Sequence, residues 1–188
     1  MKRLSMDPAD THKLQKIRRH RLFYAVTTYL FVLSVVYLIG WSGIDDISRE
    51  SWIALILVAL VGNLIFLALF LSNLNLKLPD HSMTRLQIIY SAAWGVIGVL
   101  AAPNARALVL MLYLPSFMFG SLRLARREYL ELVMIISAIL ACSLVAEYWY
   151  IRPDMNVAYE IVLWFCFTMI LIWLALFGSY VYGTKQSL

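Results

Sequence analysis

The chain has 188 residues, of which 62% are hydrophobic and only 14% are charged, and its formal net charge is +5. A soluble domain of this size is nearer half apolar and a quarter charged. These side chains cannot build a water-facing surface, so most of them must face lipid or other helices. The positive charges lie beside apolar runs, which favours an anionic membrane surface over nucleic acid as their partner.

Apolar stretches long enough to cross a bilayer recur along the chain. A helix needs about 20 residues to span roughly 30 Å of hydrocarbon. The sequence predicts an all-α, six-helix transmembrane bundle over residues 22–182, after a basic N-terminal segment at 1–21 that is too long and charged for a signal peptide. The predicted crossings are Leu22–Trp41, Trp52–Leu71, Leu86–Ala102, Ala105–Leu122, Tyr129–Glu147 and Val157–Tyr182. Pro115 should kink the fourth crossing, because proline removes a backbone hydrogen bond.

Basic residues are concentrated in the joints on one side of these crossings. Only Arg49, Arg106 and Arg152 lie on the other side. Cytoplasmic loops are enriched in Lys and Arg, so both termini are predicted to be cytoplasmic. The residues of the cytoplasmic set are Lys2, Arg3, Lys13, Lys16, Arg18, Arg19, Arg21, Lys77, Arg85, Arg123, Arg126, Arg127 and Lys185. Aromatic residues at the opposite ends, such as Trp41, Trp52 and Trp149, would form an interfacial belt.

The loop over residues 72–85 is the most distinctive inner joint. Pro79-Asp80 indicates a turn, and Thr84 with Gln87 fits a capping box that opens the third crossing. The loop is either a surface connector with a good helix cap or a rigid element that couples the membrane core to a cytoplasmic module. The second interpretation assigns coupling roles to Asn75, Asp80, Thr84 and Gln87 in the loop and to Gly178 and Ser179 where the last helix leaves the bilayer.

Catalytic chemistry has no support in the sequence. The histidines, His12, His20 and His81, all lie at the predicted cytoplasmic edge, so no intramembrane pair could ligate haem. Hydrolase, P-loop, zinc-protease and dithiol motifs are missing, and we expect no catalytic residue, metal site or cofactor. Cys142 and Cys166 lie in apolar runs and are expected to be buried free thiols.

Four residues within or beside the crossings are candidate ligand contacts. Asn63 must face the bundle, either in an interhelical hydrogen bond or in a pocket. Trp94 and Trp173 lie deeper than an interfacial belt, which fits core packing or a pocket lining. Glu147 lies near the outer surface, as does Glu160, and both could pair with Arg152 or Arg106 or contact a ligand. A cavity with such a lining would take a lipid-like or other hydrophobic small molecule.

Two stretches resemble bacterial membrane sensor domains. In these domains a run of Leu-Asn, a basic residue, then Asp, Ser, Leu or Met, Thr and Gln joins helices two and three. The chain has Leu74-Asn75-Leu76, then Pro79-Asp80-His81-Ser82-Met83-Thr84, then Gln87. The segment from Tyr113 to Gly120 with Leu122, Arg123 and Leu124 is similar to the fourth helix of these domains.

The resemblance covers roughly residues 20–185 and implies a function in signalling. Such sensor domains precede GGDEF diguanylate cyclase domains, and related six-span receptors precede class III nucleotide cyclases and histidine kinases. The implied protein is a homodimeric receptor of the bacterial inner membrane whose last helix continues, from residues 183–188, into a linker to the output domain. This chain has no GGDEF signature, so no catalytic residue carries over.

Two other classes remain open on the sequence. A substrate-binding subunit of a vitamin importer has a similar length and number of spans. Those subunits dock a partner through small residues on the first helix, whereas residues 22–41 are rich in Tyr, Val, Leu and Phe. A structural or assembly protein without a ligand is the third possibility.

Overall fold

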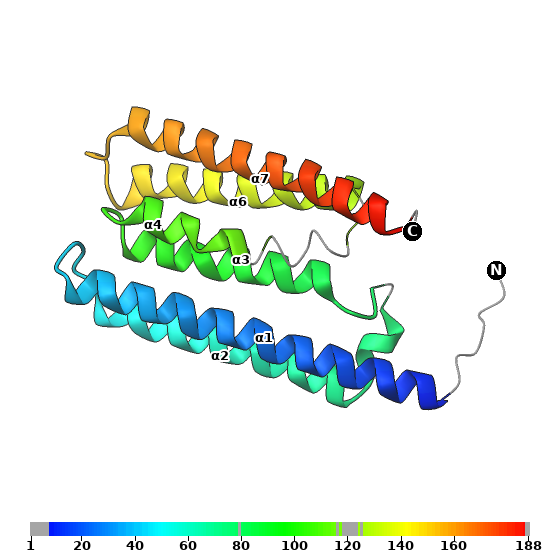
Figure 1. Cartoon of the computed structure of the whole chain (residues 1–188). Helices are drawn as coiled ribbons and strands as arrows, with labels where there is room; N and C mark the ends of the chain where they lie inside the picture. The colour runs from blue at the N-terminus through cyan, green and yellow to red at the C-terminus, as the bar shows by residue number, and fades with distance from the viewer. Residues whose placement is uncertain (1–7, 79, 116, 118–123, 125, 187–188) are drawn as a thin grey trace.

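The computed structural model describes residues 8–78, 80–115, 117, 124 and 126–186, and the elements in this part of the chain are helical. Figure 1 shows them arranged as a bundle of long helices. In chain order the elements are α1 (Pro8–Trp41), α2 (Arg49–Leu71), the 3-10 helix η1 (Leu74–Lys77), α3 (Thr84–Ala101), α4 (Arg106–Met111), α6 (Arg126–Tyr150) and α7 (Val157–Gln186).

Five of these helices are long and apolar enough to cross a membrane, namely α1, α2, α3, α6 and α7. Most boundaries fall within a few residues of those predicted. The large difference is at α1, which begins at Pro8 and takes in most of the segment predicted to precede the first crossing. The start of α2 is fixed by Ser48, whose hydroxyl accepts a hydrogen bond from the amide of Ser51 at 3.1 Å.

The fourth predicted crossing is described only in part. α4 ends at Met111, the apolar helical stretch there reaches only Pro115, and residues 116 and 118–123 lie outside the described part of the chain. Proline has no amide hydrogen to donate to the carbonyl four residues earlier, which here belongs to Met111. The carbonyl of Met111 therefore receives no hydrogen bond from Pro115, and α4 ends at the turn in which Leu112 donates to Val109.

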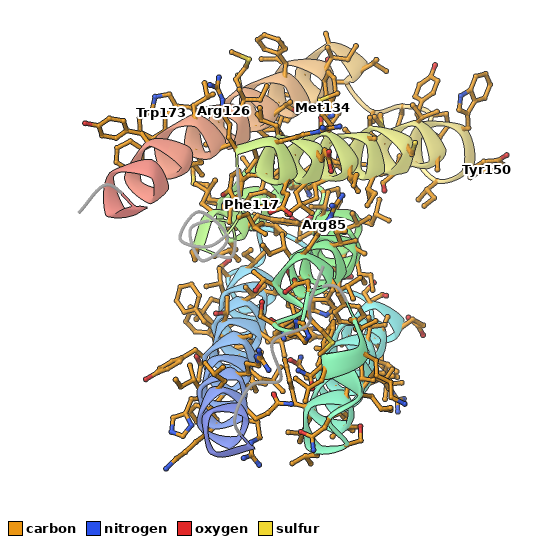
Figure 2. The ribbon with its side chains drawn as sticks, turned by 90° about the vertical axis from the view of Figure 1, so that its right-hand side faces the viewer. Arg85, Phe117, Arg126, Met134, Tyr150 and Trp173 are labelled. Carbon is orange, nitrogen blue, oxygen red and sulfur yellow. The ribbon has the colours of Figure 1, made fainter. Side chains whose placement is uncertain are left out.

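The helices pack largely in sequence order, with α2 against α1 and α3, α3 against α4 and α6, and α6 against α7. The joints after α1, α3 and α6 lie at one end of the bundle in Figure 1, and η1 and the end of α7 lie at the other. We call these the α4 end and the η1 end. In Figure 2 the pair α6 and α7 runs across the view above α1 and α2.

The outer surface of the bundle is apolar, as lipid requires. Many large hydrophobic side chains are exposed on it, including Phe23, Leu60, Phe165 and Trp173. Cys142 and Cys166 are free thiols, but the expectation that they are buried is wrong, since both are exposed on this surface. In a bilayer a cysteine side chain can face either lipid or the other helices. The apolar residues around a cysteine therefore do not show whether its thiol is buried in the bundle.

Candidate functional site

The loop at the η1 end is tied to α1 by buried amides. The Asn75 side chain is fully buried, and its Oδ1 accepts from Gln15 Nε2 at 2.8 Å while its Nδ2 donates to the carbonyl of His81 at 2.6 Å. Gln15 Nε2 also donates to Asn73 Oδ1 at 2.9 Å, and Gln15 Oε1 accepts from Arg18 Nη1 at 3.3 Å. We call Gln15, Asn73 and Asn75 the amide clasp. The amide clasp fixes the loop against α1. Within α1, Gln15 also accepts the hydrogen bond from Arg18.

The start of α3 is capped differently from the prediction. The capping box of Thr84 and Gln87 is wrong: Met83 occupies the cap position with a left-handed backbone (φ 51°), and no side chain caps the helix from there. Asp80 takes over this role, because its carboxylate accepts from the amides of Ser82 at 3.0 Å and Arg85 at 3.3 Å. The Thr84 hydroxyl lies 3.1 Å from that of Ser82. Gln87 makes no side-chain hydrogen bond within the described residues.

A cavity of about 500 Å³ lies among α1, α2, α3 and α4. Its volume is in the range of small-molecule sites in proteins. It runs from Arg18, Ser82 and Thr84 near the η1 end to Gly98 and Val109 near the α4 end. Among the described residues, the lining is Arg18, Leu22, Tyr24, Ala25, Thr28, Tyr29, Val32, Leu55, Asn63, Phe66, Ser82, Thr84, Gln87, Ile88, Ser91, Trp94, Gly95, Gly98, Val109, Leu112 and Tyr113.

Two predicted ligand contacts, Asn63 and Trp94, line this cavity. Asn63 does not make the interhelical bond considered above; its Nδ2 donates to the carbonyl of Ala59 in its own helix at 2.7 Å. The buried Trp94 indole donates to the carbonyl of Leu55 at 2.8 Å and packs against Tyr29, with ring centroids 4.6 Å apart. The wall is thus aromatic, and its buried Trp94 N–H is already hydrogen-bonded to α2.

Glu147 lies elsewhere, in a buried ion cluster at the α4 end. Arg106 Nη2 lies 2.6 Å from Glu147 Oε2, and Arg106 Nη1 lies 2.6 Å from Glu160 Oε2. All three side chains are nearly inaccessible, and Arg152 adds a longer contact of 3.8 Å to Glu147. Charges buried this deeply are tolerated because they pair with each other. The two carboxylates therefore hold α4 to α6 and α7.

Trp173 also lies away from the cavity. Figure 2 shows it on the outer side of α7, where it is 61% exposed and stacks on Phe177. The residues predicted at the exit, Gly178 and Ser179, lie on α7 as well, Gly178 buried; the side chain of Ser179 is outside the described set. The four predicted ligand residues thus divide between the cavity, the ion cluster and the lipid-facing surface.

α4 connects the cavity to α7, a role the sequence did not reveal. Tyr113, just beyond α4, lines the cavity, donates its hydroxyl hydrogen to the carbonyl of Ala92 on α3 at 3.0 Å and packs edge-on against Phe167 of α7. At the other end, Asp45 from the joint after α1 accepts from the amides of Asn104 at 3.1 Å and Ala105 at 2.7 Å. The pairing of Arg106 with Glu147 and Glu160, one of the possibilities predicted from the sequence, is confirmed, but the sequence did not indicate that it joins the cavity wall to α7.

No protein-family model, curated protein or solved structure matches this chain. The function is therefore argued from the geometry of the cavity and its connection to α7.

Proposed function

We propose that this chain is the sensory and dimerising membrane module of a bacterial receptor. The output domain in this proposal is a diguanylate cyclase, which follows α7 in the cytoplasm and joins two molecules of GTP into cyclic di-GMP. Such a cyclase needs two catalytic domains facing each other, so a homodimer that sets the position of α7 could control it. The module lies in the inner membrane with both termini cytoplasmic.

The cavity and its connection to α7 carry the proposal. Val109, Leu112 and Tyr113 form one wall of the cavity, and the same segment is fixed to α7 by the Arg106–Glu160 ion pair and by the contact between Tyr113 and Phe167. A ligand shifts a conformational equilibrium only through different affinities for its two states. In this proposal a molecule in the cavity contacts the segment that the ion pair and the ring contact fix to α7. Its binding therefore changes the position of α7, the helix that leads to the output domain.

The test is a chimera in which α7 continues into a diguanylate cyclase domain, with cyclic di-GMP as the readout. Trp94→Phe removes the indole N–H from the cavity wall, and Glu147→Gln weakens the attachment of α4, so both should change cyclic di-GMP output. Trp149→Phe is the control, because Trp149 is exposed at the α4 end. Unchanged output from both test variants would remove the receptor assignment. Copurification of the natural protein with an ATPase and a coupling-helix protein would favour an importer subunit instead.

A further inference from the structure

A groove of about 780 Å³ lies at the η1 end of the bundle, where the start of α6 packs beside the start of α3. It is separate from the cavity described above and shares no described lining residue with it. Arg85 lines the groove from α3. The rest of its described lining comes from α6 and consists of Arg126, Arg127, Leu130, Glu131, Met134 and Ile135.

The α6 side of this groove consists of two adjacent rows of side chains. Residues four apart lie on the same face of a helix, which places Arg126, Leu130 and Met134 in one row and Arg127, Glu131 and Ile135 in the other. Each row begins with an arginine and ends with an apolar residue. From Arg126 to Met134 the rise of about 1.5 Å per residue corresponds to about 12 Å along α6. The groove therefore passes from charged side chains at the end of the bundle to apolar side chains on the membrane-spanning helix.

The lining of the groove carries more positive than negative charge. Glu131 is the acidic residue of the described lining, and its carboxylate lies 3.0 Å from Arg85 Nη2 and 3.3 Å from Arg127 Nε. Neither ion pair involves Arg126, which is exposed. Glu128, on the same turn of α6, does not line the groove. Three arginines and one glutamate give the lining a formal charge of +2, and the N–H groups of arginine suit phosphate oxygens especially well.

The combination of charged and apolar surface favours a phospholipid over a soluble anion. A soluble anion would contact the arginines alone and leave the apolar side of the groove uncovered. Met134 is 65% exposed on α6, within the span that is long and apolar enough to cross the bilayer. A phospholipid covers both surfaces, with its phosphate at the arginines and its acyl chain along the apolar rows. Basic pockets between membrane-spanning helices are known to bind anionic head groups in this way.

We infer that this groove binds one anionic phospholipid. Its phosphate lies beside Arg85 and Arg126, and the start of one acyl chain lies along Leu130 and Met134. A zwitterionic phospholipid has the same phosphate, but its ammonium group would lie among guanidinium groups, so the groove discriminates against it. This inference goes beyond the receptor function and does not depend on it, because lipid binding is measured without an output domain and without a ligand in the cavity.

The experiment measures lipid binding to the full chain in neutral detergent micelles by native mass spectrometry. Phosphatidylglycerol is the probe, phosphatidylcholine with the same acyl chains is the comparison, and glycerol 3-phosphate is a competitor that has the phosphate but no chain. We expect phosphatidylglycerol to bind at lower concentration than phosphatidylcholine and to stay bound in the presence of glycerol 3-phosphate. Equal affinities for the two lipids, or displacement by an equal concentration of glycerol 3-phosphate, would overturn the inference.

Two arginines at the η1 end form a matched pair. Arg126→Gln removes a charge from the groove and should weaken phosphatidylglycerol binding about fivefold, because one basic side chain near a membrane surface contributes roughly 1 kcal/mol. Arg19→Gln removes the same charge from α1, outside the described lining, and should bind as the unaltered chain does. If the two variants bind equally, the attraction comes from the overall charge of the chain and the groove is not the site.

Removal of the carboxylate from the groove should have the opposite effect. Glu131→Gln leaves Arg85 and Arg127 without their shared acidic partner, so phosphatidylglycerol binding should strengthen by a similar factor. Glu50→Gln changes the net charge equally at an exposed position of α2, at the α4 end, and should leave binding unchanged. Binding by Glu131→Gln that is weaker than, or equal to, that of Glu50→Gln would contradict the site. None of these results bears on the receptor proposal, which is tested by cyclic di-GMP output.

Discussion

Arg106 and Glu160 join α4 to α7 through an ion pair in which Nη1 and Oε2 are 2.6 Å apart and both side chains are almost fully buried. The same guanidinium holds Glu147 of α6. A short segment that is interrupted before Pro115 is therefore anchored at its start by charge. In the membrane, where neighbouring lipid contributes no hydrophobic driving force between helices, such polar contacts specify which helices associate.

Loss of the Arg106 charge should destabilise the fold strongly. Arg106→Gln leaves Glu147 and Glu160 buried without a cation, and breaking a buried pair in this way costs about 3–5 kcal/mol. We expect a clear fall in the thermal unfolding temperature in mild detergent. Arg152→Gln is the control: Arg152 is one-third exposed and 3.8 Å from Glu147, so its effect should stay below about 1 kcal/mol. Equal unfolding temperatures for the two variants would contradict this account of the ion cluster.

The amide clasp should behave as one unit. Asn75→Ala removes the partners of the Gln15 amide and of the His81 carbonyl, and an unsatisfied buried polar group costs about 1–3 kcal/mol. Gln15→Ala should cost a similar amount, and the double variant should cost less than the sum, because the first substitution already breaks their shared bond. Lys77→Ala, at an exposed position of the same loop, is the control. Additive losses in unfolding free energy would count against a clasp.

The close contact between α3 and Tyr113 should tolerate no added side chain. A β-carbon at Gly95 would overlap the Tyr113 ring, so Gly95→Ala should destabilise the protein by about 1–3 kcal/mol. Tyr113→Leu in the same chain should recover part of this loss by removing the ring. Gly40→Ala provides the comparison, since a β-carbon there would lie 3.6 Å from Ile47 Cδ1, an ordinary contact. If Gly95→Ala unfolds at the temperature of Gly40→Ala, the packing described for Tyr113 is wrong.

Orientation in the membrane gives a prediction that does not depend on any ligand. With Cys142 and Cys166 replaced by alanine, a single cysteine at Asp46 or Asp154, both exposed at the α4 end, should react with a membrane-impermeant maleimide in intact spheroplasts. A cysteine at Lys77, at the η1 end, should react only after the membrane is opened. The reverse pattern would place both termini outside and exclude a cytoplasmic output domain after α7.

The hydrophobicity of the sequence predicted where most helices lie, but it could not predict which helix faces pack against each other. Residue runs of sufficient length predicted α2, α3, α6 and α7 within a few residues, because the bilayer sets the length of an apolar helix, whereas α1 begins at Pro8 and not at Leu22. Of the fourth predicted crossing the structure describes α4, the residues up to Pro115 and Phe117, and the rest lies outside the described part of the chain. The sequence predicted the same depth in the membrane for Trp94 and Trp173, yet Trp94 lines the cavity and Trp173 faces outward. In a membrane protein lipid and core are both apolar, so periodicity separates them poorly.

Polar contacts between distant segments could be predicted only in part. Arg106 was one of the partners predicted for Glu147 and Glu160, and the structure confirms both pairs. Gln15 was counted only as part of a basic leader, whereas it proved to be a buried anchor. Their partners lie 41 residues or more away in the chain, and no local pattern specifies such pairs. Asn75 and Asp80 were identified in advance because the run that contains them is distinctive, and the structure gives both a bonded position in the loop.

The central claim is that the contents of the cavity set the state of α7. Its most direct test is cyclic di-GMP output from the cyclase chimera carrying Thr28→Phe or Thr27→Phe, two substitutions that differ in whether the ring enters the cavity. The account predicts that Thr28→Phe, at a position that lines the cavity, shifts the output, while Thr27→Phe, at a position outside the lining, retains the output of the unaltered chimera. Identical output from both variants would contradict it.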